Sequence, residues 1–152
     1  MPQFGAKSLA QLATCHPDLQ KILRAAIPHV DFTVLEGKRS EEQQRRNVEK
    51  KVSKTMESKH VYPLDGPSRA VDVAPYPLDW PDFTQLKAIA KADVFAAIYK
   101  EIKDMCRFYR LIGYLEAVAQ QQGVAIRVGI DWDGDGDIHD QTFDDAPHIE
   151  LR

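Results

Sequence analysis

The sequence predicts an α+β fold, in which helices pack on a small, mainly antiparallel sheet. Helix-like and strand-like segments are mixed along the chain, and strand–helix–strand units are too few for a doubly wound parallel sheet. A length of 152 residues suits one compact domain with its own hydrophobic core, and no repeat or low-complexity linker divides the chain. We therefore expect a single domain over residues 1–152.

One helix and one strand are expected in the first 37 residues. Pro17 suits the first turn of a helix, and the apolar residues at helical spacing after it are Leu19, Ile22, Leu23, Ala26 and Ile27. Residues 31–36 (Asp-Phe-Thr-Val-Leu-Glu) are typical of a strand, which Gly37 ends.

A capping box at residues 40–43 predicts the next helix. The hydroxyl of Ser40 can accept a hydrogen bond from the third helical amide, and the side chain of Gln43 can reach back to the Ser40 amide. This polar helix is expected to run to about Lys51. Residues 52–68 are expected to be mostly loop, because Pro and Gly interrupt them.

The next two elements are a short strand and a long helical region. Residues 70–74 (Ala-Val-Asp-Val-Ala) form an apolar run with one carboxylate, and Pro75 stops it. Residues 82–122 are expected to be helical in two pieces, with a break near residues 92–93 or at Gly113.

Two strands are expected at the end of the chain. Gly123 is typical of a helix C-cap, and residues 125–130 then alternate between apolar and polar as a strand does. A polar loop follows, and residues 148–151 are expected to form a final short strand.

Composition excludes several classes of partner. The net charge of −3 gives no basic field for nucleic acid or an anionic membrane. No apolar run reaches the roughly 18 residues of a membrane span, and the first residues do not resemble a signal peptide, so we expect a protein left in the cytoplasm unless another agent moves it. Cys15 and Cys106 lack CxxC spacing and are expected to be free buried thiols, with a disulfide as the open alternative.

Three side chains from separate segments suggest a metal site, namely His60, Asp72 and His148. Two imidazoles and one carboxylate form the ligand set of a catalytic zinc ion, which keeps a fourth position open. Simpler explanations exist for each, because Asp72 could lie on the outward face of an edge strand and a lone His is more often a surface or hydrogen-bonded group. Asp145 lies three residues before His148 and is a candidate general base.

These motifs, in this order, resemble the M15 family of zinc peptidases. The resemblance rests on Ser58-Lys59-His60, on Ala70-Val71-Asp72 and on the run Asp-Ala-Pro-His-Ile-Glu-Leu at residues 145–151. It extends over most of the chain, through Phe4-Gly5, Gln11-Leu12, residues 17–20 and 31–34, Gly37, Arg39, residues 74–76, Asp79-Trp80 and Gly129-x-Asp131-Trp132. The family includes D-Ala-D-Ala carboxypeptidases and dipeptidases, and phage endolysins that cut the L-alanyl-D-glutamate bond of peptidoglycan. The endolysin group shows the greater resemblance.

The resemblance implies a fold and a role for each site residue. The fold would be that of D-Ala-D-Ala carboxypeptidases and hedgehog proteins, with no separate cell-wall-binding domain. Asp145 would take a proton from the attacking water and pass it to the leaving amine. Arg39 would stabilise the developing oxyanion, with a surface charge beside a helix as the alternative, and Ser58 would hydrogen-bond near the metal ligands. The implied zinc ligands are His60, Asp72 and His148.

One departure from the family pattern lies between the first two ligands. The usual motif is His-x-x-Gly-x-Ala-x-Asp, whereas His60 and Asp72 are twelve residues apart and Ser68 stands in place of the Gly. A longer loop need not move either ligand, because loop length costs little free energy. It could change the rim of the cleft and the substrate preference.

An acidic loop is a second candidate metal site. Residues 131–137 match the first half of a calcium-binding EF-hand loop, with Gly136 at position six, but position twelve is Thr142 instead of a bidentate Glu. A cation would relieve the repulsion among the carboxylates, and a solvated acidic loop is the alternative. The candidate calcium ligands are Asp131, Asp133, Asp135, Asp137 and Asp140.

The function expected from these features is a zinc-dependent endolysin that hydrolyses the L-Ala-D-Glu bond of bacterial peptidoglycan. We expect a monomer that binds no nucleic acid, stays in the host cytoplasm until a separate holin-type pore releases it, and then acts on the cell wall in the periplasm. One alternative is a D-Ala-D-Ala carboxypeptidase or dipeptidase. The other is a metal-stabilised cell-wall-binding module without catalysis, against which Asp145 argues because a binding module needs no base there.

Overall fold

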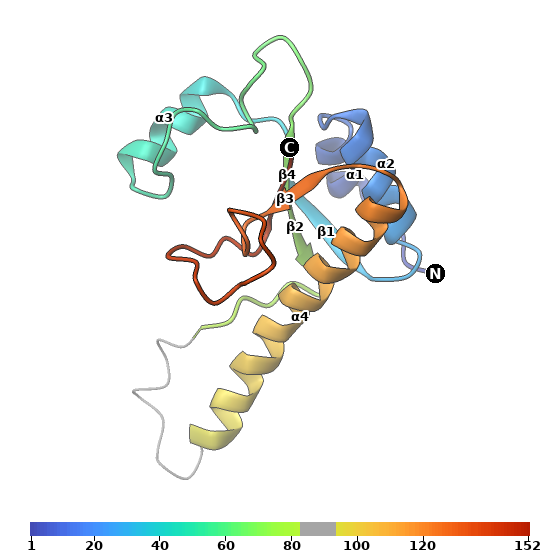
Figure 1. Cartoon of the computed structure of the whole chain (residues 1–152), viewed down its shortest axis with the longest axis vertical. Coiled ribbons are helices and arrows are strands. Elements are labelled where there is room, and N and C mark those ends of the chain that lie inside the picture. Colours follow the sequence, from blue (N-terminus) through green and yellow to red (C-terminus); the bar gives the residue numbers. More distant parts are fainter. Residues whose placement is uncertain (83–93) are drawn as a thin grey trace.

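The computed structural model describes residues 1–82 and 94–152 and contains helices and strands in mixed order (Figure 1). Its helices are α1 (Ala6–Leu12), α2 (Pro17–Ala26), α3 (Glu41–Glu49) and α4 (Val94–Gln121). Its strands are β1 (Phe32–Glu36), β2 (Ala70–Pro75), β3 (Ile126–Val128) and β4 (His148–Leu151).

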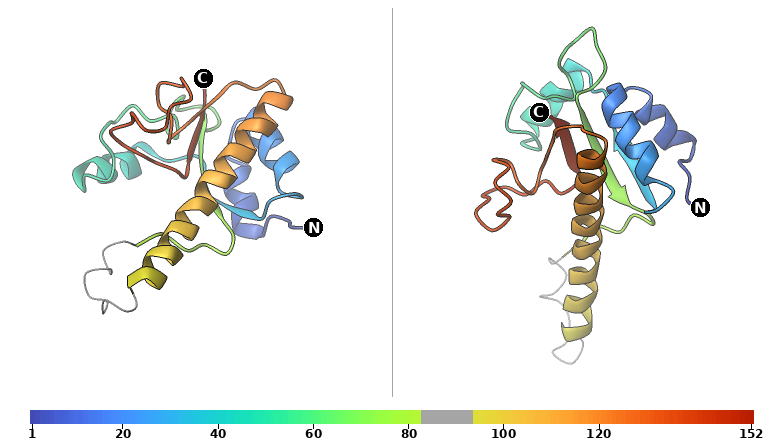
Figure 2. Two further views of the ribbon diagram at one scale, coloured as in Figure 1. Left: turned by 60° about the horizontal axis from the view of Figure 1, so that its bottom comes forward. Right: turned by 45° about the vertical axis from the view of Figure 1, so that its right-hand side comes forward.

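The four strands form one antiparallel sheet in the order β1-β2-β4-β3. Helices α1 and α2 and the C-terminal half of α4 cover one face of this sheet, whereas α3 and the loop before β4 lie on the other side (Figures 1 and 2). The N-terminal half of α4 extends beyond the sheet. The α+β fold with a small antiparallel sheet is therefore as the sequence predicts.

Along β2 and β4, side chains point alternately into the hydrophobic core and toward the opposite face of the sheet. Val71, Val73, Ile149 and Leu151 are buried in the hydrophobic core with the apolar sides of α2 and α4. Successive side chains of a strand point to opposite faces, so the residues between them turn the other way. Residues 72, 148 and 150 consequently place two carboxylates and an imidazole on the face that α1, α2 and α4 leave uncovered.

A β-bulge in β1 adds one more carboxylate to that face. Phe32 and Val34 are buried in the core, and strict alternation would send Glu36 to the same side. The register shifts between Val34 and Glu36, so that Glu36 pairs with Asp72 instead. Such a bulge re-aims a side chain, and here it carries Glu36 to the face that bears Asp72.

The helix predictions are mostly confirmed. The capping box of α3 is present, because Ser40 Oγ accepts from the Gln43 amide at 3.2 Å and Gln43 Oε1 accepts from the Ser40 amide at 2.9 Å. A break of α4 at Gly113 is wrong, since the helix continues through this exposed residue. The roughly 1 kcal/mol cost of a helical Gly is outweighed by packing of the neighbouring Leu111, Ile112 and Leu115 in the core. The other expected break, at residues 92–93, lies outside the described residues.

Other boundaries differ in detail. The sequence did not predict α1, and β3 is shorter than the expected strand at residues 125–130. Both cysteines are free, but only Cys15 is buried and Cys106 is exposed on α4, so the expectation of two buried thiols is wrong. None of the described helices combines the length and apolar character needed to cross a membrane.

Candidate active site

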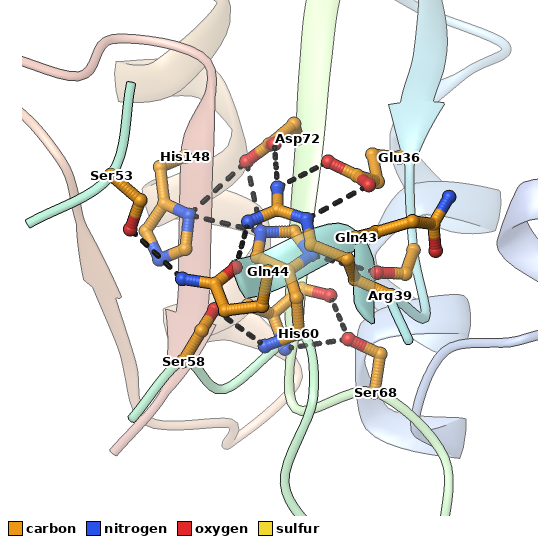
Figure 3. A network of polar contacts seen from close by, with 12 residues as sticks. Glu36, Arg39, Gln43, Gln44, Ser53, Ser58, His60, Ser68, Asp72 and His148 are labelled. Atoms are coloured by element: carbon orange, nitrogen blue, oxygen red, sulfur yellow. Dashed lines mark hydrogen bonds and ion pairs between the residues drawn. The ribbon is translucent and has the colours of Figure 1, made fainter. Parts of the chain in front are cut away.

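Three side chains converge on the uncovered face of the sheet (Figure 3). His60 Nε2 lies 3.2 Å from Asp72 Oδ1 and 3.3 Å from His148 Nδ1, and the last two atoms are 3.1 Å apart. Asp72 belongs to β2, which is an inner strand of the sheet, and its side chain is only 20% exposed. The simpler explanation of Asp72 as an exposed residue of an edge strand is therefore wrong.

His60 is fixed by hydrogen bonds from both its ring and its backbone. Nδ1 lies 2.7 Å from the carbonyl of Gly37, which leaves Nε2 to face Asp72 and His148. The amide of His60 donates to Ser58 Oγ at 3.3 Å, and its carbonyl accepts from the Arg39 amide at 3.0 Å. Ser58 thus supports the His60 backbone, near the ligands as expected, and its functional role stays a prediction.

His148 is oriented by Glu150, two residues further along β4 and on the same face. His148 Nε2 lies 3.3 Å from Glu150 Oε2, so Nδ1 faces Asp72. Glu150 is buried and is held in turn by Arg127 Nε at 2.7 Å and by the Lys59 ammonium at 3.2 Å. Glu150 was not among the predicted site residues, although its separation of two residues from His148 on a strand was the available signal.

The electrostatics of the cluster favour an ionised Asp72. Burial acts to raise the pKa of Asp72, but hydrogen bonds from His148 and His60 outweigh it and hold the pKa well below its usual range. For His148, burial acts to lower the pKa, whereas hydrogen bonds to Asp72 and Glu150 raise it to about 9. A carboxylate between two imidazoles is thus stabilised in the charged form that a cation needs.

The donor set fits a divalent metal ion of the zinc type. The three facing atoms lie within 4.8 Å of one another, and their separations of 3.1–3.3 Å match the edge of about 3.3 Å expected for a tetrahedron with zinc–ligand bonds of about 2.0–2.1 Å. The remaining nitrogen of each His is already hydrogen-bonded, as metal-ligating His residues usually are. Imidazole nitrogen favours zinc over calcium, which takes oxygen ligands.

Asp145 lies beside this cluster, at the end of the loop that leads into β4. Burial and the negative charge of Asp72 raise the pKa of Asp145, and the positive charges of His148, His60 and Arg39 oppose the shift. Asp145 lines the same cleft as His60, Asp72 and His148. No hydrogen bond to this carboxyl is present among the residues that the structure describes, so it is available to a bound molecule. Its role as the base stays a prediction.

Arg39 is a positioned guanidinium and not a surface charge. Its side chain is 11% exposed, and Nε and Nη2 both donate to the carboxylate of Glu36 while Nη1 donates to Gln44 Oε1 at 2.6 Å. Gln44 is fully buried and donates to Ser53 Oγ and to the carbonyl of Thr55. Nη2 of Arg39 lies 3.8 Å from Asp72 Oδ2, so the guanidinium adjoins the metal-site carboxylate (Figure 3).

Comparison with known proteins identifies the family of this chain. The sequence profile of the phage L-alanyl-D-glutamate peptidase family matches residues 1–102 and 93–152. The chain belongs to this family. The L-alanyl-D-glutamate peptidase of Escherichia phage T5 is 32% identical over 162 aligned positions that cover 98% of this chain and 97% of the T5 protein.

A solved structure shares the fold of this member of the phage L-alanyl-D-glutamate peptidase family. The crystal structure of the Serratia marcescens L-Ala D-Glu endopeptidase ChiX matches with a TM-score of 0.68, over 99% of this chain and 91% of that chain. The sequence identity of this pair is 24%, so the similarity shows the fold alone.

In this family member, the candidate metal site opens into a cleft of about 750 Å³. One wall comes from α3 and the segment after it, and the other comes from the loop before β4. Trp132 stacks on the ring of His148 with centroids 5.4 Å apart, and Phe143 stacks on Trp132 at 6.4 Å. A row of aromatic rings therefore leads from the metal site along the second wall.

The insertion between His60 and Asp72 does not border this cleft. Residues 62–67 are absent from the cleft lining and project away from it, at the top of Figure 1. The ammonium of Lys38 fixes this loop by donating to the carbonyls of Val61 at 2.7 Å, Gly66 at 2.9 Å and Pro63. The expected change in the cleft rim is therefore not present at these residues.

The structure brings together part of the acidic loop of this family member. Carboxylate oxygens of Asp131, Asp133 and Asp135 lie within 4.8 Å of one another, but Asp137 and Asp140 do not join them. The two oxygens of Asp131, which is buried, accept from the amides of Gly134 at 2.8 Å and Gly136 at 3.0 Å. These two glycines have φ values of +77° and +88°, a backbone conformation that favours Gly.

Proposed function

We propose that this protein is a zinc-dependent peptidase that hydrolyses the L-alanyl-D-glutamate bond of peptidoglycan. The observation that carries the proposal is the convergence of His60, Asp72 and His148 at the base of a cleft that also presents Asp145 and Arg39. Membership of the phage L-alanyl-D-glutamate peptidase family supports the substrate, and the mixed nitrogen and oxygen donors support zinc.

Each polar residue of the cleft has a distinct part in this chemistry. Zinc, when bound at such a site, lowers the pKa of a water molecule and polarises a carbonyl oxygen. The carboxylate of Asp145 takes a proton from the attacking water and gives it to the leaving amine. The guanidinium of Arg39 offsets the negative charge that develops on the scissile carbonyl oxygen.

The cellular setting follows from the same proposal. An endolysin of this kind would act as a monomer, remain in the host cytoplasm after synthesis and reach the peptidoglycan only after a separate pore-forming protein opens the inner membrane. Purified protein should then lyse Gram-negative cells whose outer membrane has been permeabilised, because the pore is no longer needed. Expression inside host cells that lack the pore-forming protein is the matched control, and lysis of these cells would contradict the need for a release step.

The masses of soluble fragments from digested peptidoglycan test the activity. Cleavage between L-alanine and D-glutamate leaves a new amino group on D-glutamate, whereas a carboxypeptidase or dipeptidase would release D-alanine or its dipeptide. Stripping the metal or replacing His148→Ala should stop cleavage, and zinc should restore it only to the stripped wild-type protein. Cell-wall binding without new fragments would favour the non-catalytic module, and cleavage that persists without zinc would contradict the mechanism.

We also propose that the cluster of Asp131, Asp133 and Asp135 binds calcium. Three carboxylates with oxygens within 4.8 Å repel one another, and calcium is the cation that prefers such oxygen ligands. The loop leads directly to Asp145 and His148, so an ion there would order the wall of the cleft. Calcium should raise the melting temperature of the zinc-loaded protein but not that of Asp133→Asn. If neither activity nor melting temperature responds to calcium, the loop is simply solvated.

A further inference from the structure

One cation of the cleft has no carboxylate partner among the residues that the structure describes. Four basic side chains line the cleft, and among the described residues three of them form ion pairs: Arg39 with Glu36, and both Lys59 and Arg127 with Glu150. The fourth is Lys54, which is exposed and for which no carboxylate lies within 4.0 Å in the described parts of the chain. Its charge is therefore available to a molecule that enters the cleft.

The ammonium of Lys54 is held in place by an aromatic ring of the opposite wall. Lys54 belongs to the segment after α3, and its Nζ lies 4.3 Å from the ring centroid of Phe143, in the loop before β4. A cation over an aromatic face is attracted by the ring quadrupole. The contact joins the two walls and favours a position of the ammonium over the Phe143 ring without neutralising its charge.

In the proposed reaction, this place lies on the side of the cleft that receives the leaving amine. Phe143 is two residues before Asp145, a spacing of about 6–7 Å in extended chain. In the proposed reaction Asp145 gives its proton to the leaving amine, so the residue that carries this amine must lie next to Asp145. The ammonium of Lys54, 4.3 Å from the ring centroid of Phe143, is therefore near the position expected for the residue that carries the amine.

The residue that carries the amine has a free acidic group. A glutamate joined to its predecessor through its nitrogen still has two carboxyl groups, and only one of them can continue the peptide. The other remains as a carboxylate or as its amide. A charged donor such as an ammonium distinguishes these two forms, because its hydrogen bond to a carboxylate is stronger than that to a neutral amide.

We propose that Lys54 recognises the free carboxylate of the glutamate on the amine side of the cleaved bond, and so makes the protein selective for substrates in which this group is not amidated. The proposal rests on the proposed peptidase function. It assigns Lys54 to substrate binding and not to proton transfer, so its loss should act mainly on KM, since an interaction made equally in the ground state and the transition state leaves kcat unchanged.

The test compares two soluble muropeptides that differ only in the D-glutamate carboxylate or its primary amide. Wild-type protein should have the higher kcat/KM for the acid, and Lys54→Met should lower the acid-to-amide ratio about tenfold, as expected for one charge-assisted hydrogen bond. Lys54→Arg should restore the preference. Lys50→Met, which removes a charge of the same sign outside the cleft lining, should keep the wild-type ratio.

The same variants separate the possible sources of the carboxylate. A second substrate pair differs in whether the third residue is diaminopimelate or lysine, and therefore in a carboxylate further along the peptide. An unchanged acid-to-amide ratio in Lys54→Met, or a loss that follows the third residue instead, would overturn the inference while leaving the proposed function intact. Failure of the wild-type protein to cleave any of these substrates would overturn the proposed function and the inference with it.

Discussion

Asp72 and His148 are direct partners across the antiparallel pair of β2 and β4, with their side chains on the same face of the sheet. The register therefore fixes two of the three candidate metal ligands relative to each other before any ion binds. His60 completes the set from a loop whose position depends on hydrogen bonds to Gly37 and Ser58. Two ligands on rigid strands favour a site of defined geometry over one that closes around its ion.

Loss of the Asp72 carboxylate should abolish tight zinc binding. Asp72→Asn keeps the shape of the side chain but removes the charge that lies between His60 and His148. We expect Asp72→Asn to weaken zinc binding by more than the roughly 10–100-fold that is typical of an outer hydrogen-bond partner. Isothermal titration calorimetry of the metal-free protein measures this change. Asp144→Asn, in the same cleft but outside the ligand cluster, should bind one zinc as the wild type does.

Glu150 should tune zinc affinity without contacting the ion. It orients His148 through Nε2, and Arg127 and Lys59 hold its carboxylate. Glu150→Gln preserves the volume but weakens these contacts, so zinc affinity should fall roughly 10–100-fold. Competition with a chelator of known affinity gives the change. Glu57→Gln removes the same charge elsewhere in the cleft lining, and an equal fall for both variants would mean that only the overall charge of the cleft matters.

Arg39 should not tolerate exchange for lysine. A lysine cannot reproduce the paired contacts with Glu36 together with the contact to Gln44. We expect Arg39→Lys to lower kcat by about 100-fold, the scale for removing one stabiliser of a developing oxyanion, while zinc content stays at the wild-type level. Steady-state kinetics and metal analysis of the same sample distinguish a lower kcat from a loss of bound zinc. The matched control is Arg46→Lys on α3, whose exposed pair with Glu42 lies outside the cleft lining.

The loop between His60 and Asp72 should open when Lys38 is replaced. Its ammonium donates to three backbone carbonyls, and Lys38→Met leaves these acceptors unsatisfied. We expect faster proteolysis within residues 62–67 and a loss of about 1–3 kcal/mol in the free energy of unfolding. Zinc affinity should change little, because the loop does not line the cleft. A Lys38→Met protein as resistant to proteolysis as the exposed-lysine control Lys7→Met would contradict this assignment.

The two cysteines should differ strongly in reactivity. Burial raises the pKa of Cys15 to about 11, whereas Cys106 is exposed on α4. The thiolate is the reactive form, so at pH 8 only about one Cys15 thiol in 1,000 is ionised, and the rate of its alkylation should rise tenfold per pH unit up to about pH 11. Mass spectrometry after iodoacetamide treatment should show modification of Cys106 first. Modification of Cys15 at an equal rate would mean that α1 and its contacts open readily.

Part of the site could be predicted because Asp72 and His148 sit on strands with recognisable sequence patterns. A charged residue within the apolar run 70–74 needs a compensating partner, and the C-terminal run from Asp145 to Leu151 supplied an imidazole at the right position of a strand. The capping box fixed the start of α3 for a local reason, since both hydrogen bonds join residues 40 and 43. A structural feature that depends on interactions between nearby residues can be predicted from a short stretch of sequence.

The parts that the sequence did not predict depend on tertiary contacts. Glu36 reaches the site only because a bulge shifts the register of β1 against β2. The sequence of β1 contains no signal that predicts this shift. Gly113 does not break α4, because the neighbouring residues of the helix pack in the hydrophobic core and stabilise it. The role of Glu150 could not be predicted because it depends on the inner position of β4 in the sheet. There the Glu150 carboxylate contacts both Arg127 and Lys59.

The central position of β4 also has a consequence for the order in which the protein folds. Asp72 and His148 are 76 residues apart, so the pairing of β2 with β4 closes a long loop that includes all of α4. Contacts between distant residues form slowly, because the entropy of loop closure is lost before they stabilise the chain. Neither the ligand set nor the position of Asp145 exists until that step. A nascent or partly folded chain is therefore without the catalytic geometry, and activity should appear in refolding experiments only with the slowest phase.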